Sequence, residues 1–450
     1  MMLNIAELKQ KACGTIEAHR DELIGIAKEI LSNPEVGFSE VKTARLVADK
    51  FSQLGIQHQK GLAITGVKGR FSGGAGQGPR LAILGELDSL VVEEHLFADD
   101  GTGAAHACGL NCQIGMMLGA TMGLLTPEVL ERLSGEIVPF AVPAEEFIEV
   151  ERRLQLREDG HLELLGGKQE LIRLGEFDDI DLAMMCHTAS DMGDRKFAVG
   201  GTSNGHVVKY VQYTGRGAHA GSAPHLGINA LNAASFALQA MHSNRETHLA
   251  DDTVRIHGII TRGGEAVSAV PSDVRLEWRV RSGSPEAVVK NSAVVDRCFR
   301  AGALAVGASV RITTIPGYLP IRHDTKIQEL FQENATTLLG ESSILVMPPR
   351  RNRGGSTDMG DLSQMMPICH PYTGGADGPG HSKDYTINDY EQAVINPAKI
   401  MAMVAIDLLA EGGAKGNEVV KTHRPAMRKA AYLKFQRERA EVSQYDGAST

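Results

Sequence analysis

Three short apolar runs, each followed by ionisable side chains, constrain the fold of this chain more than any other feature. They occupy residues 81–84, 137–142 and 180–186, and helical patterns separate them. Runs of this length are typical of parallel strands buried on both faces. Their alternation with helices predicts an α/β domain with a doubly wound, mostly parallel sheet. Pro139 weakens the prediction of a central strand for the second run, because proline cannot donate to a strand ladder.

The ionisable side chains come directly after these runs. Glu86 and Asp88 follow the first, Glu145 and Glu146 the second, and His187 the third. In open α/β sheets, ligands collect at the carboxyl ends of the strands. A single acid after one strand is usually a solvated loop residue, but the repeated pattern indicates a shared site.

Cys108 precedes an apolar, proline-free stretch over residues 114–125 that predicts a buried helix, and Asn111 is a suitable N-cap for it. A helix N-terminus favours the thiolate form, which binds metals and attacks carbon. The cysteine is therefore a metal ligand, a nucleophile or a small buried hydrophobic residue. The last is the commonest role for a lone cysteine, and this stretch alone excludes none of the three.

The pattern changes at about residue 204. Alternating apolar and polar residues at 207–213 and 273–280 predict strands with one solvated face, and residues 227–241 and 285–306 have helical spacing. This segment predicts an α+β unit about the size of a small domain.

The α+β unit is predicted to be an insertion, because residues 391–409 form a strongly apolar helix suited to closing the first domain's core. We expect a first domain of residues 1–203 and 319–450, interrupted by a second at residues 204–318. For residues 421–450 we expect a surface helix or a partly mobile tail.

Composition excludes several classes of partner. The net charge of -9 gives no electrostatic footprint for nucleic acid or an anionic membrane. No apolar run approaches the ~20 residues of a membrane span, and the N-terminus lacks the apolar block of a signal peptide. Six irregularly spaced cysteines fit a reducing compartment. We expect a cytoplasmic protein that acts on a small molecule.

A series of short motifs runs through nearly the whole chain. They are Asn33-Pro-Glu-Val-Gly-Phe38, His106-Ala-Cys-Gly109, Pro143-Ala-Glu-Glu146, Gly215-Arg-Gly-Ala-His219, Ala269-Val-Pro-Ser-Asp273, Gly355-Ser-Thr-Asp358 and Gly380-His381-Ser. In this order they resemble the M20 metallopeptidase family, and most of all its amidohydrolase branch. That branch includes aminoacylases, auxin-conjugate hydrolases and aminobenzoyl-glutamate hydrolases.

The resemblance implies a catalytic domain with a metal site, interrupted by a lid domain through which the chain forms a homodimer or a higher homo-oligomer. Cys108 matches the family's metal-bridging thiolate, Glu146 a carboxylate ligand, and His187 and His381 imidazole ligands. Glu145 matches the general base. Thiolate, imidazole and carboxylate together suit a transition ion such as zinc or manganese, and a neighbouring carboxylate can take a proton from water.

Two further residues match by resemblance. Asp88 matches the acid that orients the metal site, and His219 matches a lid histidine that binds substrate or the developing oxyanion in the partner subunit's site. Arg262, Arg279 and Arg281 have the chemistry to bind a substrate carboxylate, but arginines on strands are usually solvated. We leave these three outside the predicted site.

Leu110 departs from the family pattern, which usually has a histidine ligand there. Three explanations are open: a single bound ion, substitution by Cys112 or His106, or an inactive protein. We favour one manganese or zinc ion per chain, because Cys108 and the other predicted ligands remain.

The leading prediction is a metal-dependent hydrolase that cleaves a C–N bond in a small carboxylate-bearing substrate, such as an N-acyl amino acid or an aminobenzoyl amide. A second hypothesis is an aminohydrolase that releases ammonia from an aminobenzoate such as 5-nitroanthranilate, as one family member does. A third is an inactive family member with a binding role.

Overall fold

The three apolar runs form adjacent strands of one sheet in the computed structural model, which describes residues 3–449. In spatial order the six strands are β1 (Gln57–Leu62), β2 (Gly66–Ser72), β6 (Glu136–Val142), β3 (Arg80–Glu86), β7 (Leu182–Met184) and β15 (Ile368–Cys369). β3 is parallel to both of its neighbours, and β15 is parallel to β7. β1 and β2 join antiparallel at one edge.

Pro139 does lie in a central strand, contrary to the doubt that the sequence raised. The ladder between β2 and β6 has no pairs between Lys68 and Phe71, opposite Pro139, where an N–H donor is missing. Gly69 lies in this gap, and a Cβ there would be 3.1 Å from Pro139 Cγ. The sheet therefore accommodates the proline through a local break in one ladder.

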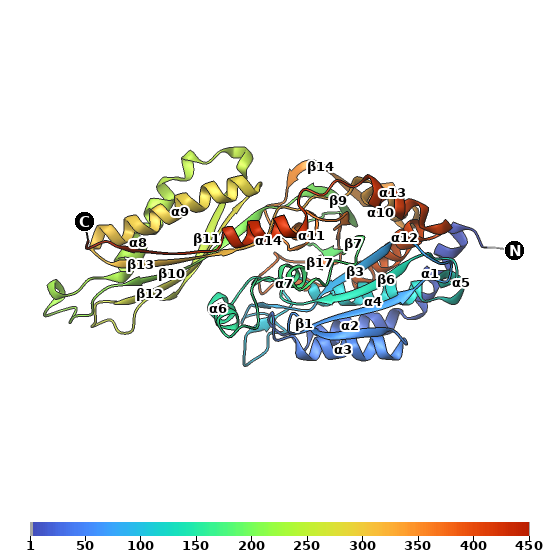
Figure 1. Ribbon diagram of the computed structural model, residues 1–450. Coiled ribbons are helices and arrows are strands. Elements are labelled where there is room, and N and C mark those ends of the chain that lie inside the picture. Colours follow the sequence, from blue (N-terminus) through green and yellow to red (C-terminus); the bar gives the residue numbers. More distant parts are fainter. Residues whose placement is uncertain (1–2, 450) are drawn as a thin grey trace.

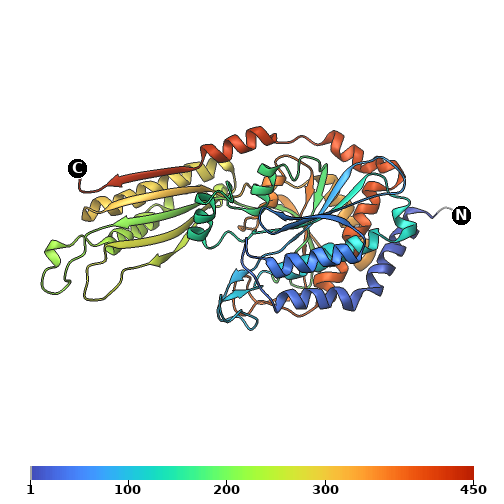
Figure 2. The ribbon, with the colours of Figure 1, turned by 60° about the horizontal axis from the view of Figure 1, so that its bottom comes forward.

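Helices cover both faces of this sheet (Figures 1 and 2). Leu81 and Ile83 pack into one core and Ala82 and Leu84 into another, because successive strand residues point to opposite faces. The first core includes α1 (Ile5–Ala18), α2 (Arg20–Leu31), α3 (Val41–Gln53), α4 (Leu110–Leu124), α5 (Pro127–Leu130), α10 (Thr325–Leu339), α12 (Asn396–Leu409) and α13 (Ala414–Thr422). The second includes α7 (Gly167–Leu174), α11 (Met359–Leu362) and α14 (Lys429–Glu438). The predicted doubly wound α/β architecture is confirmed.

One helical segment, Glu391–Leu409, is long and apolar enough by composition to cross a membrane. It joins a π-helical turn to α12, and 89% of its tested window is buried inside the protein. α12 packs against α1, α4 and α10, so this segment is a core helix, as its apolar pattern predicts.

A second, five-stranded sheet forms the other part of the molecule, which extends to one side in Figure 1. Its strands are β11 (Arg255–Arg262), β12 (Asp273–Ser282), β10 (Gly205–Thr214), β13 (Ser309–Pro316) and β19 (Glu441–Asp446), all antiparallel. Helices α8 (Ala230–Ser243) and α9 (Pro285–Val306) share a core with it. This is the predicted inserted α+β unit.

The C-terminal segment differs from the prediction. Helices α13 and α14 form, but residues 441–446 are a strand that pairs with β13 and extends the second sheet. The tail is therefore ordered, and β19 departs from the predicted assignment of residues 319–450 to the first domain. Figure 2 shows the C-terminal segment running from one part of the molecule to the other.

Short strands near the junction of the two parts position side chains of the site. A four-stranded sheet has the order β14 (Ile344–Asn352), β9 (Phe197–Thr202), β16 (Tyr372–Thr373) and β8 (His187–Thr188). His187 is paired there with Tyr372. The remaining strands and α-helix are β4 (Leu90–Val91), β5 (Ala104–Ala105), β17 (Ala376–Asp377), β18 (Thr386–Ile387) and α6 (Val150–Glu158).

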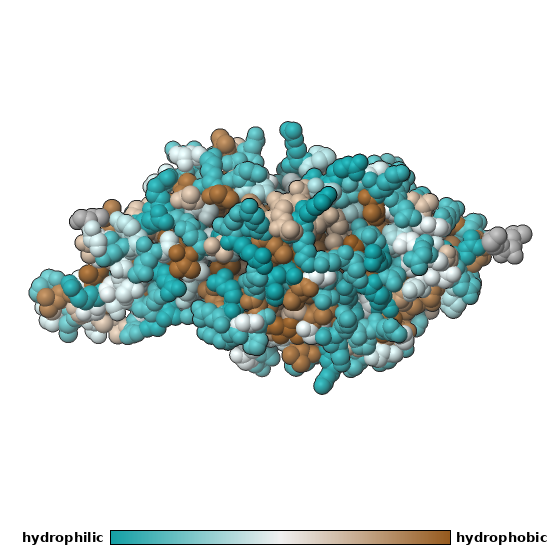
Figure 3. Space-filling view, in the orientation of Figure 1, coloured by the Kyte–Doolittle hydropathy of each residue, from teal (hydrophilic) through white to brown (hydrophobic). Residues whose placement is uncertain are grey.

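The face of the molecule shown in Figure 3 is mainly hydrophilic, with hydrophobic side chains in small groups between polar ones. Scattered exposed apolar residues of this kind are normal for a globular protein.

Candidate functional site

A cavity of about 480 Å³ lies between the two parts of the molecule. The first part contributes predicted site residues and the second contributes basic strand residues. Its lining includes Cys108, Glu145, Glu146, Phe147, His187, Ser356, His370, Tyr372, His381, Arg353, Arg255, His257, Arg279 and Arg281.

Cys108 reaches this cavity because of the backbone at Gly109. Gly109 precedes α4 with φ of 81°, and a Cβ there would lie 2.0 Å from Thr188 Oγ1, so only glycine fits. The helix begins at Leu110, earlier than the sequence predicted, and Asn111 does not cap it. Instead, the Asn111 side-chain amide donates a hydrogen bond to the Ala27 carbonyl at 3.0 Å.

The predicted metal ligands lie together. Cys108 Sγ is 3.4 Å from His187 Nε2, and Glu146 Oε1 is 3.5 Å from His381 Nε2. The donor atoms of Cys108, Glu146 and His381 all lie within 4.8 Å of one another. Two donors of one tetrahedral ion, each ~2.0–2.3 Å from it, are about 3.5 Å apart. The spacing therefore suits a transition ion.

The state of these donors also fits a cation. Glu146 Oε1 is buried without a hydrogen-bond partner among residues 3–449. Burial raises the pKa of the Cys108 thiol well above its usual value, and the Glu146 and Glu145 carboxylates raise it further. Burial lowers the pKa of His187, which favours the neutral imidazole that ligates metals. A bound cation would offset the repulsion between thiolate and carboxylates.

Asp88 fixes the direction of the two glutamates. Its carboxylate accepts the backbone N–H of Glu145 at 3.0 Å and that of Glu146 at 2.8 Å, and it is fully buried. The Glu145 carbonyl accepts a hydrogen bond from the Tyr318 hydroxyl. Asp88 thus supports the glutamates from behind the cavity, in the arrangement that the resemblance implies.

A buried ion-pair cluster lies next to Glu145. Lys168 Nζ is 2.6 Å from Glu86 Oε1 and 2.5 Å from Asp358 Oδ1, and all three side chains are buried. Carboxylate oxygens of Glu86, Glu145 and Asp358 lie within 4.8 Å of one another. Burial raises the pKa of Glu145 well above its usual value, the Glu86 and Glu146 charges raise it further, and the Lys168 ammonium lowers it. No sequence pattern singled out Lys168.

Neither residue suggested as a substitute for the missing histidine lines the cavity. Leu110 is buried in the first turn of α4, and Cys112 belongs to the core beneath the sheet. His106 is buried as well, and burial lowers its pKa to about 3. The four predicted ligands therefore remain the candidates for holding an ion.

His370 lines the cavity but was missed from the sequence. It is 2% exposed, neither ring nitrogen has a hydrogen-bond partner in the described part of the chain, and its ring centroid is 6.0 Å from that of His187. It directly follows β15, so the pattern of ionisable residues at strand ends could have found it.

His219 does not line the cavity of its own chain. It is exposed after β10, where its Nδ1 accepts the N–H groups of Gly221 and Ser222 at 3.1 and 3.0 Å. Its action in a partner subunit's site stays a prediction.

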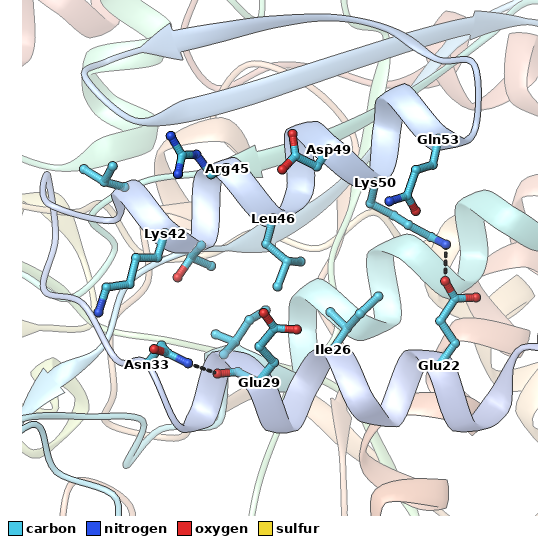
Figure 4. A pocket seen from close by; sticks show the side chains of 13 residues that line it. Glu22, Ile26, Glu29, Asn33, Lys42, Arg45, Leu46, Asp49, Lys50 and Gln53 are labelled. Carbon is cyan, nitrogen blue, oxygen red and sulfur yellow. Dashed lines mark hydrogen bonds and ion pairs between the residues drawn. The ribbon is translucent and has the colours of Figure 1, made fainter.

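A separate groove of about 530 Å³ lies between α2 and α3 (Figure 4). It is lined by charges of both signs, including the ion pair of Lys50 with Glu22. No predicted site residue lies there, so the groove plays no part in the assignment that follows.

Fold and site together define a two-domain protein in which a cavity lined by the predicted metal ligands lies between an α/β domain and an inserted α+β domain. Residues 200–301 match the family model described as the M20 peptidase dimerisation domain. The Xaa-Arg dipeptidase of Mus musculus is 28% identical over 89% of both chains. An IAA-amino acid hydrolase of Arabidopsis thaliana is 25% identical over 79% of this chain and 77% of its own.

Among solved structures, the Bacillus subtilis YXEP protein, described as a dinuclear metal binding peptidase from the M20 family, shares the fold. Its TM-score is 0.63 at 19% identity, over 87% of this chain and 99% of its own. The resemblance of the chain to the M20 family is therefore confirmed. The prediction of a hydrolase that acts on C–N bonds is confirmed with it.

Proposed function

We propose that this protein is a metal-dependent amidohydrolase that cleaves the amide bond of an N-acyl amino acid, with one manganese or zinc ion per chain. The observation that carries the proposal is the set of Cys108, Glu146 and His381 donors, with His187 beside Cys108, in a cavity that also exposes Glu145. The names of the relatives, a dipeptidase and an amino acid hydrolase, support an amide substrate.

The residues divide the work of hydrolysis between them. Cys108, Glu146, His187 and His381 would hold the ion, which when bound supplies Lewis-acid activation of water and of the scissile carbonyl. Glu145 lies next to a predicted ligand, and burial raises its pKa well above its usual value. A carboxylate in this position can accept and return a proton. It accepts a proton from the attacking water and passes it to the leaving nitrogen, so the amide is split into a carboxylic acid and an amine.

The test combines metal content with product analysis. Protein loaded with manganese or zinc and then desalted should retain about one ion per chain and release free amino acid from N-acyl amino acids. Glu145→Gln should lower kcat about 10²–10⁴-fold and leave the metal content unchanged. The matched control is Glu158→Gln, an exposed acid on α6 that should keep full activity.

Product identity distinguishes the proposal from the two other hypotheses. Release of ammonia from an aminobenzoate without release of any amino acid would show an aminohydrolase. Absence of both bound metal and turnover would support the binding-protein hypothesis. Full activity in Glu145→Gln would show that another group is the base.

A further inference from the structure

The second domain contributes a cluster of basic residues to the cavity that the amide chemistry does not use. Arg255 is paired across the strands with Arg281, and His257 with Arg279. All four line the same cavity as the predicted metal ligands. Like charges directly opposite each other on neighbouring strands are destabilising, so the pair of Arg255 and Arg281 weakens the sheet unless an anion joins it. His257 is neutral, because burial lowers its pKa to about 4.

The three arginines have no acidic partner within salt-bridge distance among residues 3–449. Other arginines on these two strands do: Arg262 pairs with Glu265 and Asp273, and Arg275 with Asp273 and Glu151. On these two strands, the arginines outside the cavity are thus paired with acids, whereas Arg255, Arg279 and Arg281 keep their charge available.

The guanidinium groups of Arg279 and Arg281 are held in place with donors to spare. Arg281 donates to His257 Nε2 at 3.2 Å and to Ser356 Oγ at 3.0 Å, which uses two of the five N–H groups of a guanidinium. Arg279 donates to the Phe147 carbonyl and lies over the Phe147 ring. Fixed guanidinium groups with free donors are suited to binding carboxylates bidentately.

Electrostatics agrees with this geometry. Burial, and next the Arg279 charge, lower the pKa of Arg281 to about 10, and burial lowers the pKa of Arg279. Arg353 also lines the cavity, 4.1 Å from the ring centroid of Tyr372, but it is already paired with Asp191 at 2.6 Å. The guanidinium groups of Arg255, Arg279 and Arg281 still carry more positive charge than a single substrate carboxylate would neutralise.

We infer that the cluster of Arg255, His257, Arg279 and Arg281 selects conjugates of an acidic amino acid, binding both carboxylates of an N-acyl glutamate or N-acyl aspartate. This specificity rests on the proposed amide hydrolysis and deepens it. A substrate whose amino acid is arginine or lysine is disfavoured, because its side chain would face like charge. The chain therefore differs in substrate from its relatives named Xaa-Arg dipeptidases.

The experiment measures binding by calorimetry on metal-free protein with N-acetyl-L-glutamate, N-acetyl-L-glutamine and N-acetyl-L-arginine. The glutamate and glutamine conjugates have nearly the same shape, so the ratio of their affinities isolates the effect of the second carboxylate charge. We expect glutamate to bind at least about tenfold more tightly than glutamine, and arginine to bind weakest. Arg281→Gln and Arg279→Gln should each bring the glutamate-to-glutamine ratio close to one.

Arg262→Gln is the matched control, because it removes an arginine of the same strand pair that lies outside the cavity and is already ion-paired. It should keep the wild-type ratio. Equal affinity for glutamate and glutamine, an unchanged ratio in both cavity variants, or no binding of N-acetyl-L-glutamate would each overturn the inference.

Failure of the proposed function has a different signature. In that case metal-loaded protein would hydrolyse none of the three compounds while the binding preference persists. Hydrolysis of the glutamine or arginine conjugate as fast as the glutamate conjugate would instead overturn the specificity and leave the amidohydrolase assignment intact.

Discussion

Asp88 shows how one buried side chain sets the direction of two functional ones. It does not line the cavity, yet both of its carboxylate oxygens accept backbone N–H groups, one from Glu145 and one from Glu146. Burial, and then the charges of Glu40 and Glu146, raise the pKa of Asp88 well above its usual value. Each of the two hydrogen bonds uses one acceptor oxygen of Asp88. Burial and the neighbouring charges make it costly to keep this side chain ionised.

The variant Asp88→Asn tests this role. Asparagine keeps the size but places an NH₂ group against a backbone N–H, so one hydrogen bond becomes a repulsive contact. We expect metal affinity to fall about 10–100-fold, as for other residues that orient a ligand, with activity falling alongside. Calorimetric titration with zinc measures the change. Asp21→Asn, at an exposed acid of α2, is the control, and equal affinity in both variants would contradict the role.

At the residue scale, the sequence identified the side chains that meet in the cavity better than the residues around them. The predicted ligands Cys108, Glu146, His187 and His381 do lie together; their binding of a metal stays a prediction. Lys168 and Arg281 gave no such signal. From the sequence, a lysine at the start of a short helix is expected to be solvated, but Lys168 is buried and paired with Glu86 and Asp358. Strand alternation does not reveal that the face carrying Arg281 lines a cavity between two domains.

At the scale of elements, α4 is fixed by small residues that let other helices approach. Gly115, Gly119 and Gly123 recur every four residues on one face of the helix. A Cβ on each would lie 2.8 Å from a side-chain atom of Val394, Ala398 or Ile16, so the three glycines are packed closely against α1, α12 and the turn before it. Cys108, immediately before the helix, depends on this packing for its position.

Gly119→Ala should therefore destabilise the protein although alanine is the better helix former. We expect a loss of about 1–3 kcal/mol in the free energy of unfolding from overpacking against Ala398 and Leu23. Gly14→Ala in α1 is the matched control, since a Cβ there meets nothing within 4 Å and should gain about 0.5–1 kcal/mol. Urea denaturation followed by circular dichroism measures the free energy of unfolding of both variants. Equal changes in the two would show that α4 can accommodate a methyl group at position 119.

Strands were harder to predict than helices. The buried parallel strands have continuous apolar runs, and the sequence located them. β19 reads Glu-Val-Ser-Gln-Tyr-Asp and lies at a sheet edge, where one row of backbone groups and most side chains face solvent. The preceding helix α14 is held by Tyr432 and Gln436, which donate hydrogen bonds to the buried Asp361. No local sequence pattern encodes such a tertiary contact.

At the scale of the whole molecule, the two domains contribute different chemistry to one cavity. The first supplies the donors and Glu145, and the second supplies the arginines. His219 stands apart, exposed on the second domain and outside its own cavity. A histidine that acts in catalysis from this position would have to reach another subunit, and the match of residues 200–301 to a dimerisation domain makes such an assembly expected.

Mixing two inactive variants tests whether His219 acts between subunits. If it does, His219→Ala and Glu145→Gln are each inactive as homodimers. A hybrid dimer then has one intact site, because the Glu145 of one subunit meets the His219 of the other. Equal mixing with subunit exchange gives half hybrids, so activity should return to about a quarter of the wild-type value. If His219 served its own chain, every hybrid site would lack one of the two groups and the mixture would stay inactive.

The control is His225→Ala mixed with Glu145→Gln. His225 is a neighbouring exposed histidine outside the cavity, so the His225→Ala homodimer should be fully active before mixing.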